Sequence, residues 1–225
     1  MFLNINIGIR AHIKFCEETS CTTTVKDSTG HGWDVTLYNG AVAAYGVLTL
    51  DGNTQYAAFP SGLVSDLTEY TIMCKVNVAD VYLNAIIWDF GMDSGTDIYL
   101  QASFEATDMA MFGGDLNDMN RQWFQIESIA TNKWIHISIC YKDGRVGAYI
   151  DGVQIASFNF PIIPTQFSSN PLNWIGRSIR DIFPYFFGSI ADFRVYERAL
   201  SAHEIQGISQ GSFLQFLLLI RMLLA

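Results

Sequence analysis

The chain has 225 residues, of which 50% are hydrophobic, 14% aromatic and 16% charged. This composition excludes a disordered chain, and the length suffices to bury one substantial core. Lys and Arg number 13 against 22 Asp and Glu, which gives a net charge of −9. Because such a surface repels phosphate backbones, we expect no nucleic-acid partner. The excess of carboxylates is compatible with divalent cations but does not specify a metal site.

The N-terminal residues alternate in polarity, which distinguishes them from a secretory signal peptide with its apolar block behind a basic start. Odd-numbered residues from Ile5 to Phe15 are apolar, whereas the even-numbered ones between them are polar or glycine. This period of two predicts a first strand with one buried face. The polar stretch 17–32 predicts a loop behind it.

Short extended segments separated by turn residues occupy most of the following chain. They are predicted at 33–38, 46–50, 55–59, 70–78, 84–90, 97–103, 109–112, 122–126, 134–141, 146–150 and 153–158. Asp151-Gly152 fits a two-residue hairpin turn, because both central positions of that turn need positive φ. No long 3.6-residue periodicity precedes residue 200, so a parallel sheet with crossover helices is disfavoured. The pattern predicts an all-β domain, namely a two-sheet antiparallel β-sandwich.

The segment 189–196 alternates once more and predicts the closing strand. Ala191, Phe193 and Val195 fall on one face, whereas Ile190 and Asp192 share the other face with residues 194 and 196. This is the period of a strand with one buried face.

A capped helical turn is predicted behind that strand, at 201–207. Ser201 and Glu204 stand three residues apart, the spacing at which their side chains satisfy the free amides of a helix start. The final stretch, Phe213–Ala225, is almost wholly apolar but too short to cross a bilayer alone, since a spanning helix needs about 20 residues. Residues 1–210 are therefore predicted to form one domain and 211–225 an apolar tail of unassigned role. A helix packed on the domain, a partner-binding helix, a membrane contact and part of a longer chain all stay open for the tail.

Four cysteines bear on the redox compartment. Cys74 and Cys140 lie in apolar strand-like runs, where cysteine behaves as a small hydrophobe. Cys16 and Cys21 are close enough in sequence for a local disulfide. Zinc is disfavoured, because these two and His31 lack the paired spacing of structural zinc sites. The compartment stays undecided on this basis.

An ordered series of motifs resembles the laminin-G-like jelly-roll family of concanavalin A-like folds, the type often attached to secreted bacterial enzymes and adhesins. The resemblance runs from about His12 to Gly207, and its last motif is the most specific. The motifs, in chain order, are IKFCEETSCTTTVKDSTGHGWDVTLYNGA, LTLDGNTQYAAFP, TIMCKVNV, NKWIHISICYKDGRVGAYIDGVQIA, NWIGRS and YFFGSIADFRVYERALSAHEIQ. The chain departs from the family at Cys16 and Cys21, where Asp and Gly are common, and in both terminal extensions. The resemblance implies a jelly-roll sandwich and an extracellular or cell-surface location.

The resemblance also implies one structural calcium ion near the joined ends of the sandwich. The matching positions are Asp27 in the Ser-Gly loop, Asp51 before Gly52, and Asp192 in the last strand. Calcium takes six to eight oxygen ligands, which carboxylates supply. The alternative is that these side chains hydrogen-bond to nearby backbone amides in their own turns.

Two loop regions carry residues suited to binding a sugar, because aromatic faces stack on C–H surfaces while planar polar groups bond hydroxyls. The first is Trp123 with Arg121, and the second is Tyr185 with Arg180 and Arg177 nearby. The alternative is that such aromatics merely cover sheet edges.

Catalysis is not predicted. Glycosidases of this broad fold often present Glu-x-Asp-x-Glu on one strand face, and that triplet is missing from the sequence, as is a nucleophile elbow. We therefore predict a noncatalytic recognition module that binds carbohydrate. The alternatives are a protein-interaction or structural module of a cell-surface protein, whose partner is another surface protein, and a glycoside hydrolase with carboxylates assembled from distant strands.

Overall fold

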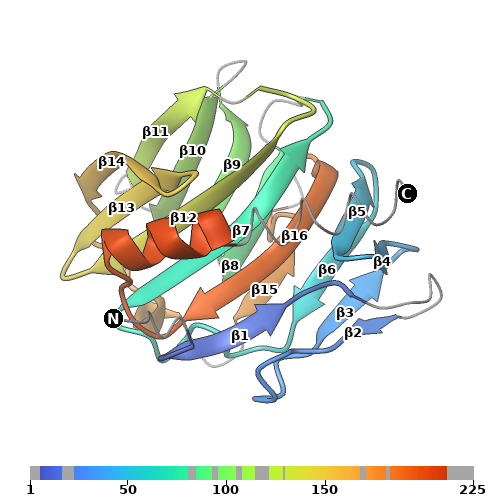
Figure 1. Cartoon of the computed structure of the whole chain (residues 1–225), viewed down its shortest axis with the longest axis horizontal. Coiled ribbons are helices and arrows are strands. Elements are labelled where there is room, and N and C mark those ends of the chain that lie inside the picture. Colours follow the sequence, from blue (N-terminus) through green and yellow to red (C-terminus); the bar gives the residue numbers. More distant parts are fainter. Residues whose placement is uncertain are drawn as a thin grey trace.

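The computed structural model describes residues 6–16, 23–80, 85–92, 96–104, 108–114, 122–128, 130–167, 171–180 and 183–211. Within 103–104, 108–114, 122–124 and 126–128 it describes the backbone alone. The strands form two antiparallel sheets that stack face to face (Figure 1). The all-β sandwich predicted from the sequence is therefore confirmed.

Sheet A carries the closing strand at its centre. Its strands in spatial order are β14 (Val153–Asn159), β13 (Arg145–Ile150), β12 (Trp134–Lys142), β7 (Tyr70–Val78), β16 (Phe187–Tyr196), β5 (Val47–Asp51) and β4 (Val42–Ala44), with β1 (Ile9–Ile13) also on β16. β7 lines one side of β16, while β5 pairs with the first half of the other side and β1 with the second half.

Sheet B packs against it. Its strands in spatial order are β11 (Gln122–Ser128), β10 (Asp108–Gly114), β9 (Asp97–Phe104), β8 (Ile86–Gly91), β15 (Leu172–Ile175), β6 (Tyr56–Phe59), β3 (Val35–Tyr38) and β2 (Thr24–Val25). A 3₁₀ turn, η1 (Pro164–Gln166), precedes β15. The short strands β2, β4 and β15 were not predicted.

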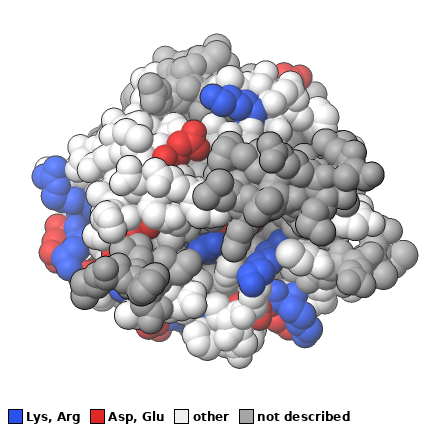
Figure 2. All heavy atoms as spheres, in the orientation of Figure 1, with Lys and Arg blue, Asp and Glu red and all other residues white. Residues whose placement is uncertain are grey.

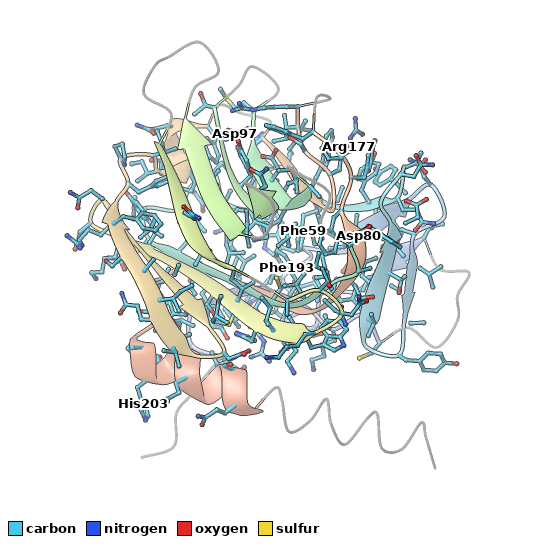
Figure 3. The ribbon with its side chains drawn as sticks, turned by 90° about the horizontal axis from the view of Figure 1, so that it is seen from above. Phe59, Asp80, Asp97, Arg177, Phe193 and His203 are labelled. Carbon is cyan, nitrogen blue, oxygen red and sulfur yellow. The ribbon has the colours of Figure 1, made fainter. Side chains whose placement is uncertain are left out.

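The core lies between the inner faces of the two sheets. Phe59 of sheet B and Phe193 of sheet A meet there with ring centroids 5.7 Å apart, and Phe90 lies 6.2 Å from Phe193. Figure 3 shows Phe59 and Phe193 between the sheets, with the helix that carries His203 on one outer side and Asp97 and Arg177 on the other. Each outer face is therefore partly covered by chain that leaves a sheet and folds back over it.

A β-bulge in β16 changes which side chains of the closing strand face the core. The pairing with β7 shifts between Ala191 and Arg194, and Asp192 has φ of 50°. Because the bulge inserts an extra residue, the alternation restarts, and Ile190 joins Phe193 in the core. The prediction that Ile190 and Phe193 lie on opposite faces was wrong.

A helix over residues 202–211 covers the outer face of sheet A (Figure 1). Its predicted capping box is confirmed: the Glu204 amide donates to Ser201 Oγ over 3.3 Å, and the Ser201 amide donates to Glu204 Oε2 over 2.9 Å. The helix buries apolar side chains against the sheet in a second cluster. Its members are Met73, Tyr149, Tyr196, Leu200, Ile205 and Ile208.

Local features at three other places bear on the predictions. The hairpin turn is confirmed, since Asp151 and Gly152 have φ of 50° and 81°. The first strand is shorter than predicted, because the chain turns before Ile9 and leaves Ile7 exposed. Cys74 is fully buried, as predicted, whereas Cys21 lies outside the described residues.

Candidate ligand-binding surface

Alternation along three strands of sheet B sends aromatic side chains to its outer face. In β3, β6 and β15 the inward residues are buried, whereas Tyr38, Tyr56 and Trp174 point outward. The register aligns them: Tyr38 is paired with Tyr56, and Ala58 with Trp174. Adjacent strands lie about 4.8 Å apart, so the three rings are neighbours on one surface.

These rings and two residues after β15 form one group, which we call the aromatic platform: Tyr38, Tyr56, Trp174, Arg177 and Tyr185. Tyr38 stacks on Tyr56 with a centroid distance of 4.5 Å and an interplanar angle of 3°. Tyr56 in turn lies 5.5 Å from Trp174 and 6.4 Å from Tyr185. Tyr38 is 39% exposed and Tyr56 only 9%, so the inner ring supports an outer ring that solvent reaches.

Arg177 holds the platform together. Its Cζ lies 4.2 Å from the ring centroid of Trp174, 5.0 Å from Tyr56 and 5.7 Å from Tyr185. Each such cation–π contact contributes about 0.5–2 kcal/mol, depending on how far it is shielded from water. The half-buried guanidinium therefore fixes three rings from different parts of the chain in one arrangement.

The chain reaches this position through a turn that needs glycine. Gly176, directly after β15, has φ of 82°, and a Cβ there would collide with Leu50 Cδ1. The Gly176 amide donates to the Ile87 carbonyl oxygen over 2.9 Å. We call Gly176–Arg180 the anchor segment, since it returns the chain across the outer face of sheet B.

Beside the platform, the anchor segment covers a polar part of the same face. Asp89 pairs with Trp174 on one side and with Tyr99 on the other, and it is fully buried. Asp97 is also fully buried and forms an ion pair with Arg180, with Nη2 2.7 Å from Oδ1. The outer face of sheet B thus carries partly exposed rings at one end and buried charges at the other.

The structure brings only part of the predicted ligand set together. Tyr185 lies in the platform with Arg177, as the second predicted group implied. Arg180, in contrast, is 6% exposed and bound to Asp97, so it lies in the interior and not on the surface. The Trp123 backbone lies in β11, but its side chain and the whole of Arg121 fall outside the description.

Sequence reasoning missed Tyr38, Tyr56 and Trp174. For Tyr38 and Tyr56 a signal was present: each stands on the outward side of a short alternation whose inward residues are apolar. For Trp174 it was not, because the inward residue before it is Asn173. The pairing of β3 with β6 and of β6 with β15 could not be foreseen, and it brings Tyr56 and Trp174, 118 positions apart, into contact.

The carboxylates of the predicted calcium set are each engaged by protein donors. The two oxygens of Asp27 accept bonds from the amides of His12, Thr29 and Trp33 and from the Thr29 hydroxyl. Asp51 Oδ1 accepts three amides, from residues 53, 54 and 55. These amide bonds lower the pKa of the Asp51 carboxyl below its usual value, although partial burial opposes them.

Asp192 lies in an ionic cluster on sheet A. His12 Nε2 is 2.7 Å from its Oδ1, and Arg194 donates through Nε and Nη2 over 2.8 and 3.0 Å. Burial would raise the pKa of Asp192, but the bond from His12 and the charge of Arg194 hold it well below its usual range. Among the described residues, no three His, Cys, Asp or Glu side chains form a group that could hold a metal ion. Structural calcium stays a prediction.

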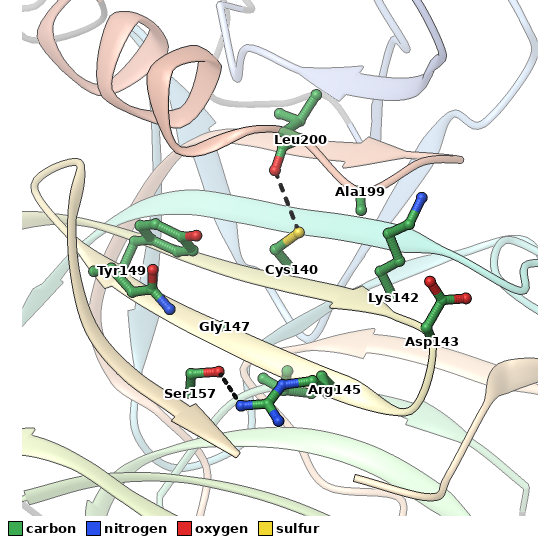
Figure 4. Close-up of a pocket in the computed structure, with 11 residues that line it drawn as sticks. Cys140, Lys142, Asp143, Arg145, Gly147, Tyr149, Ser157, Ala199 and Leu200 are labelled. Atoms are coloured by element: carbon green, nitrogen blue, oxygen red, sulfur yellow. Dashed lines mark hydrogen bonds between the residues drawn. The ribbon is translucent and has the colours of Figure 1, made fainter. Parts of the chain in front are cut away.

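A pocket of about 360 Å³ opens on the outer face of sheet A, between the β12–β14 hairpins and the corner at Leu200 (Figure 4). Two of its polar side chains are bound to neighbours: Arg145 donates to Ser157 Oγ over 3.2 Å, and Lys142 Nζ lies 2.8 Å from Glu69. The aromatic residue in its lining, Tyr149, is 7% exposed. The pocket therefore offers a sugar less stacking surface than the platform.

The charged side chains on one face of the molecule give no second candidate. On the face drawn in Figure 2, Lys and Arg side chains are scattered among Asp and Glu side chains, without one basic patch among the residues shown in colour. No helix in the described part of the chain is long and apolar enough to cross a membrane.

A laminin G family model, described as the concanavalin A-like lectin/glucanases superfamily, matches residues 51–206. The chain belongs to this superfamily. Among curated proteins, a stretch of 92 residues is 32% identical to human (Homo sapiens) Usherin; it covers 39% of this chain and 2% of Usherin. The match to the superfamily confirms the laminin-G-like resemblance.

Solved structures with the same fold include domains of carbohydrate-active proteins. Domain 4 of AbnA, a GH43 extracellular arabinanase from Geobacillus stearothermophilus in complex with arabinotriose, aligns with a TM-score of 0.73 at 22% identity, over 89% of this chain and 98% of that one. Trypanosoma rangeli sialidase in complex with sialic acid aligns with a TM-score of 0.72 at 16% identity, over 91% and 33%. The binding domain of Paraclostridial Mosquitocidal Protein 1 aligns with a TM-score of 0.70 at 15% identity, over 93% of this chain and 53% of that one. At these identities the likeness shows the shared fold of the superfamily.

Proposed function

We propose that this chain is a noncatalytic recognition module that binds saccharide on the aromatic platform. The observation that carries the proposal is the arrangement of Tyr38, Trp174 and Tyr185: partly exposed rings held in place by Tyr56 and Arg177. Rings fixed before binding lose little conformational freedom when they stack on a sugar ring. The guanidinium and the tyrosine hydroxyls supply polar groups for sugar hydroxyls.

The comparisons support the ligand class. Two aligned structures are described as complexes with a saccharide, arabinotriose in one and sialic acid in the other. The chain covers nearly all of the arabinanase domain, whereas it spans a third of the sialidase chain. An extracellular or cell-surface location forms part of the proposal, in line with the extracellular enzyme that carries the aligned domain.

The absence of catalysis is supported by the state of the carboxylates on the same face. Asp89 and Asp97 are adjacent on neighbouring strands but fully buried. A glycosidase needs two carboxyl groups on either side of the scissile bond, within reach of substrate. With both groups under the anchor segment, this pair does not meet that condition.

The test is binding of the full chain to a glycan array, followed by titration with arabinotriose and with sialic acid. Tyr38→Ala is expected to weaken binding about tenfold, or about 1.4 kcal/mol, because it removes the exposed ring. Tyr45→Ala is the matched control, since Tyr45 is a 62% exposed tyrosine outside the platform. A loss with Trp123→Ala and none with Tyr38→Ala would move the site to Trp123. No glycan binding, combined with loss of a protein partner on deleting 213–225, would favour a protein-interaction module.

A further inference from the structure

Two fully buried carboxylates on one sheet face are unexpected in a sugar-binding surface. Asp89 and Asp97 stand on neighbouring strands of sheet B, where Gly91 pairs with Asp97 and Tyr99 with Asp89. Taking a carboxylate out of water costs several kcal/mol, in order of magnitude, unless partners compensate it. Their partners therefore show what the buried pair does.

Those partners belong to the anchor segment. The Ser178 hydroxyl and the Ile179 amide both donate to Asp89 Oδ2 over 2.9 Å. Arg180 donates through Nε to Asp97 Oδ2 over 2.9 Å and through Nη2 to Oδ1 over 2.7 Å. The two acids thus bind three consecutive residues that directly follow Arg177, the residue at the centre of the aromatic platform.

The packed environment raises the pKa of both acids above its usual value. Burial and the charge of Asp97 raise the pKa of Asp89 well above its usual value. Burial raises the pKa of Asp97 to about 6, although Arg180 lowers it. Asp89 Oδ1 has no hydrogen-bond partner among the described residues, in keeping with a neutral acid at that position. The described ionisable groups that face the pair are Arg180 and Tyr99, and the pKa of Tyr99 is itself raised by burial.

We propose that Asp89 and Asp97 are positioning residues that dock the anchor segment and Arg177 onto sheet B, and that undocking releases protons. The saccharide affinity of the platform is then higher in mild acid than at neutral pH. This inference rests on the proposed function for its effect on affinity, but docking itself can be measured without a ligand.

Thermodynamic linkage between protonation and docking gives the direction of the pH dependence. An undocked, hydrated aspartate has a pKa of about 3.9, whereas both docked carboxyls have higher values. The docked state is therefore favoured fully below about pH 4 and loses this advantage as pH rises through about 6 for Asp97, and further for Asp89. Each proton released makes the undocking equilibrium about tenfold more favourable per pH unit.

The first experiment is hydrogen exchange of the Ile179 amide in the full chain, between about pH 5 and pH 8. After correction for intrinsic exchange, its protection is expected to fall about tenfold per pH unit, since exchange requires undocking from Asp89. Amides of the central strand β7 serve as the control and are expected to keep their protection. Corrected Ile179 protection that does not change with pH would overturn the proposal.

Asp89→Asn supplies the matched variant, because its amide oxygen still accepts from Ser178 and Ile179 but the group does not titrate. It is expected to flatten the pH dependence of Ile179 exchange; an unchanged slope contradicts the role of Asp89. Should this variant fail to fold, Ser178→Ala gives a second test. Loss of its hydroxyl donor is expected to lower the protection of the Ile179 amide at every pH without changing how steeply protection depends on pH. A changed pH dependence would contradict the assignment of the titration to Asp89.

The second experiment measures saccharide affinity at about pH 5 and about pH 7.5 for wild type and Asp89→Asn. The wild type is expected to bind more tightly at the lower pH, and the variant to show a smaller difference between the two pH values, because only Asp97 still titrates there. A pH effect of the same size in the variant assigns it to another group and overturns the link between Asp89 and affinity. If Tyr38→Ala has no effect on binding, the platform is wrong as a site, whereas the Ile179 result still decides whether the acid pair controls docking.

Discussion

The outer faces of the two sheets are covered in different ways. On sheet A, the 202–211 helix buries an apolar cluster, and nearby Asp192 is bound by His12 and Arg194. On sheet B, the anchor segment is held by polar bonds to two buried acids and leaves aromatic rings partly exposed beside it. Apolar cover stabilises without selecting a ligand, whereas a polar, partly open cover can respond to one. Under the proposed function, the helix-covered face contributes stability and the face with the aromatic platform contributes recognition.

The largest expected effect comes from breaking the cover of sheet A. Ile205→Ala removes a fully buried side chain between the helix and the sheet and is expected to lower the free energy of unfolding by about 2–5 kcal/mol. Urea denaturation measures it. His203→Ala, at an exposed position on the same helix, is the control, with an expected change within about 0.5 kcal/mol. Saccharide affinity of the folded variant should equal that of wild type; a weakened affinity would show that the two faces are coupled.

The next effect tests the ionic cluster of sheet A. Asp192→Asn keeps the side-chain shape and tolerates the positive φ of the bulge, but it leaves Arg194 without its carboxylate. We expect a loss of about 3 kcal/mol at neutral pH. Because the pKa of Asp192 is lowered in the fold, its contribution is present above about pH 4 and disappears as pH falls further.

The measurement is urea denaturation of wild type and Asp192→Asn across that pH range. A difference that stays constant down to about pH 2 would contradict the assigned role of the carboxylate charge. The sign is opposite to that of the acid pair on sheet B, where stability is lost as pH rises. The two faces are therefore expected to differ in their pH response as well as in their cover.

A smaller effect is expected from Arg177→Lys on sheet B. Lysine keeps the charge but loses the planar guanidinium that lies over Trp174, Tyr56 and Tyr185. Saccharide affinity is expected to fall about fivefold, or about 1 kcal/mol, with little change in unfolding free energy. Titration calorimetry and urea denaturation separate the two quantities. Equal affinity would show that charge alone suffices, and a large loss of stability would place Arg177 with the structural groups of sheet A.

Sequence patterns predicted the parts of the fold that depend on local chemistry. The Ser201–Glu204 cap and the Asp151-Gly152 turn were correct, because each is decided by residues within one turn of the chain. The predicted face of Ile190 was wrong. A bulge depends on how β16 pairs with β7, and the alternation of polar and apolar residues does not reveal it.

The candidate site was predictable only in part for the same reason. Tyr185 stands in a loop rich in charged and aromatic residues, and composition alone indicates it. Tyr38 and Tyr56 stand in ordinary strands, and only the pairing of those strands with β15 brings them to Arg177. The burial of Arg180 could not be foreseen either, since it depends on Asp97, 83 positions away.

The smallest expected effect concerns calcium, which the family resemblance predicts. Of the three candidate carboxylates, Asp51 is exposed, and its Oδ2 has no hydrogen-bond partner among the described residues. Calcium bound there adds about 0.4 kcal/mol of stability when its concentration equals the dissociation constant, and more at higher concentration. Thermal melting with added calcium and with EDTA measures this shift. Asp51→Asn is the matched variant, because it keeps an oxygen for the turn amides but removes the charge that attracts the ion. Identical melting temperatures of the wild type with added calcium and with EDTA would contradict the predicted structural calcium ion.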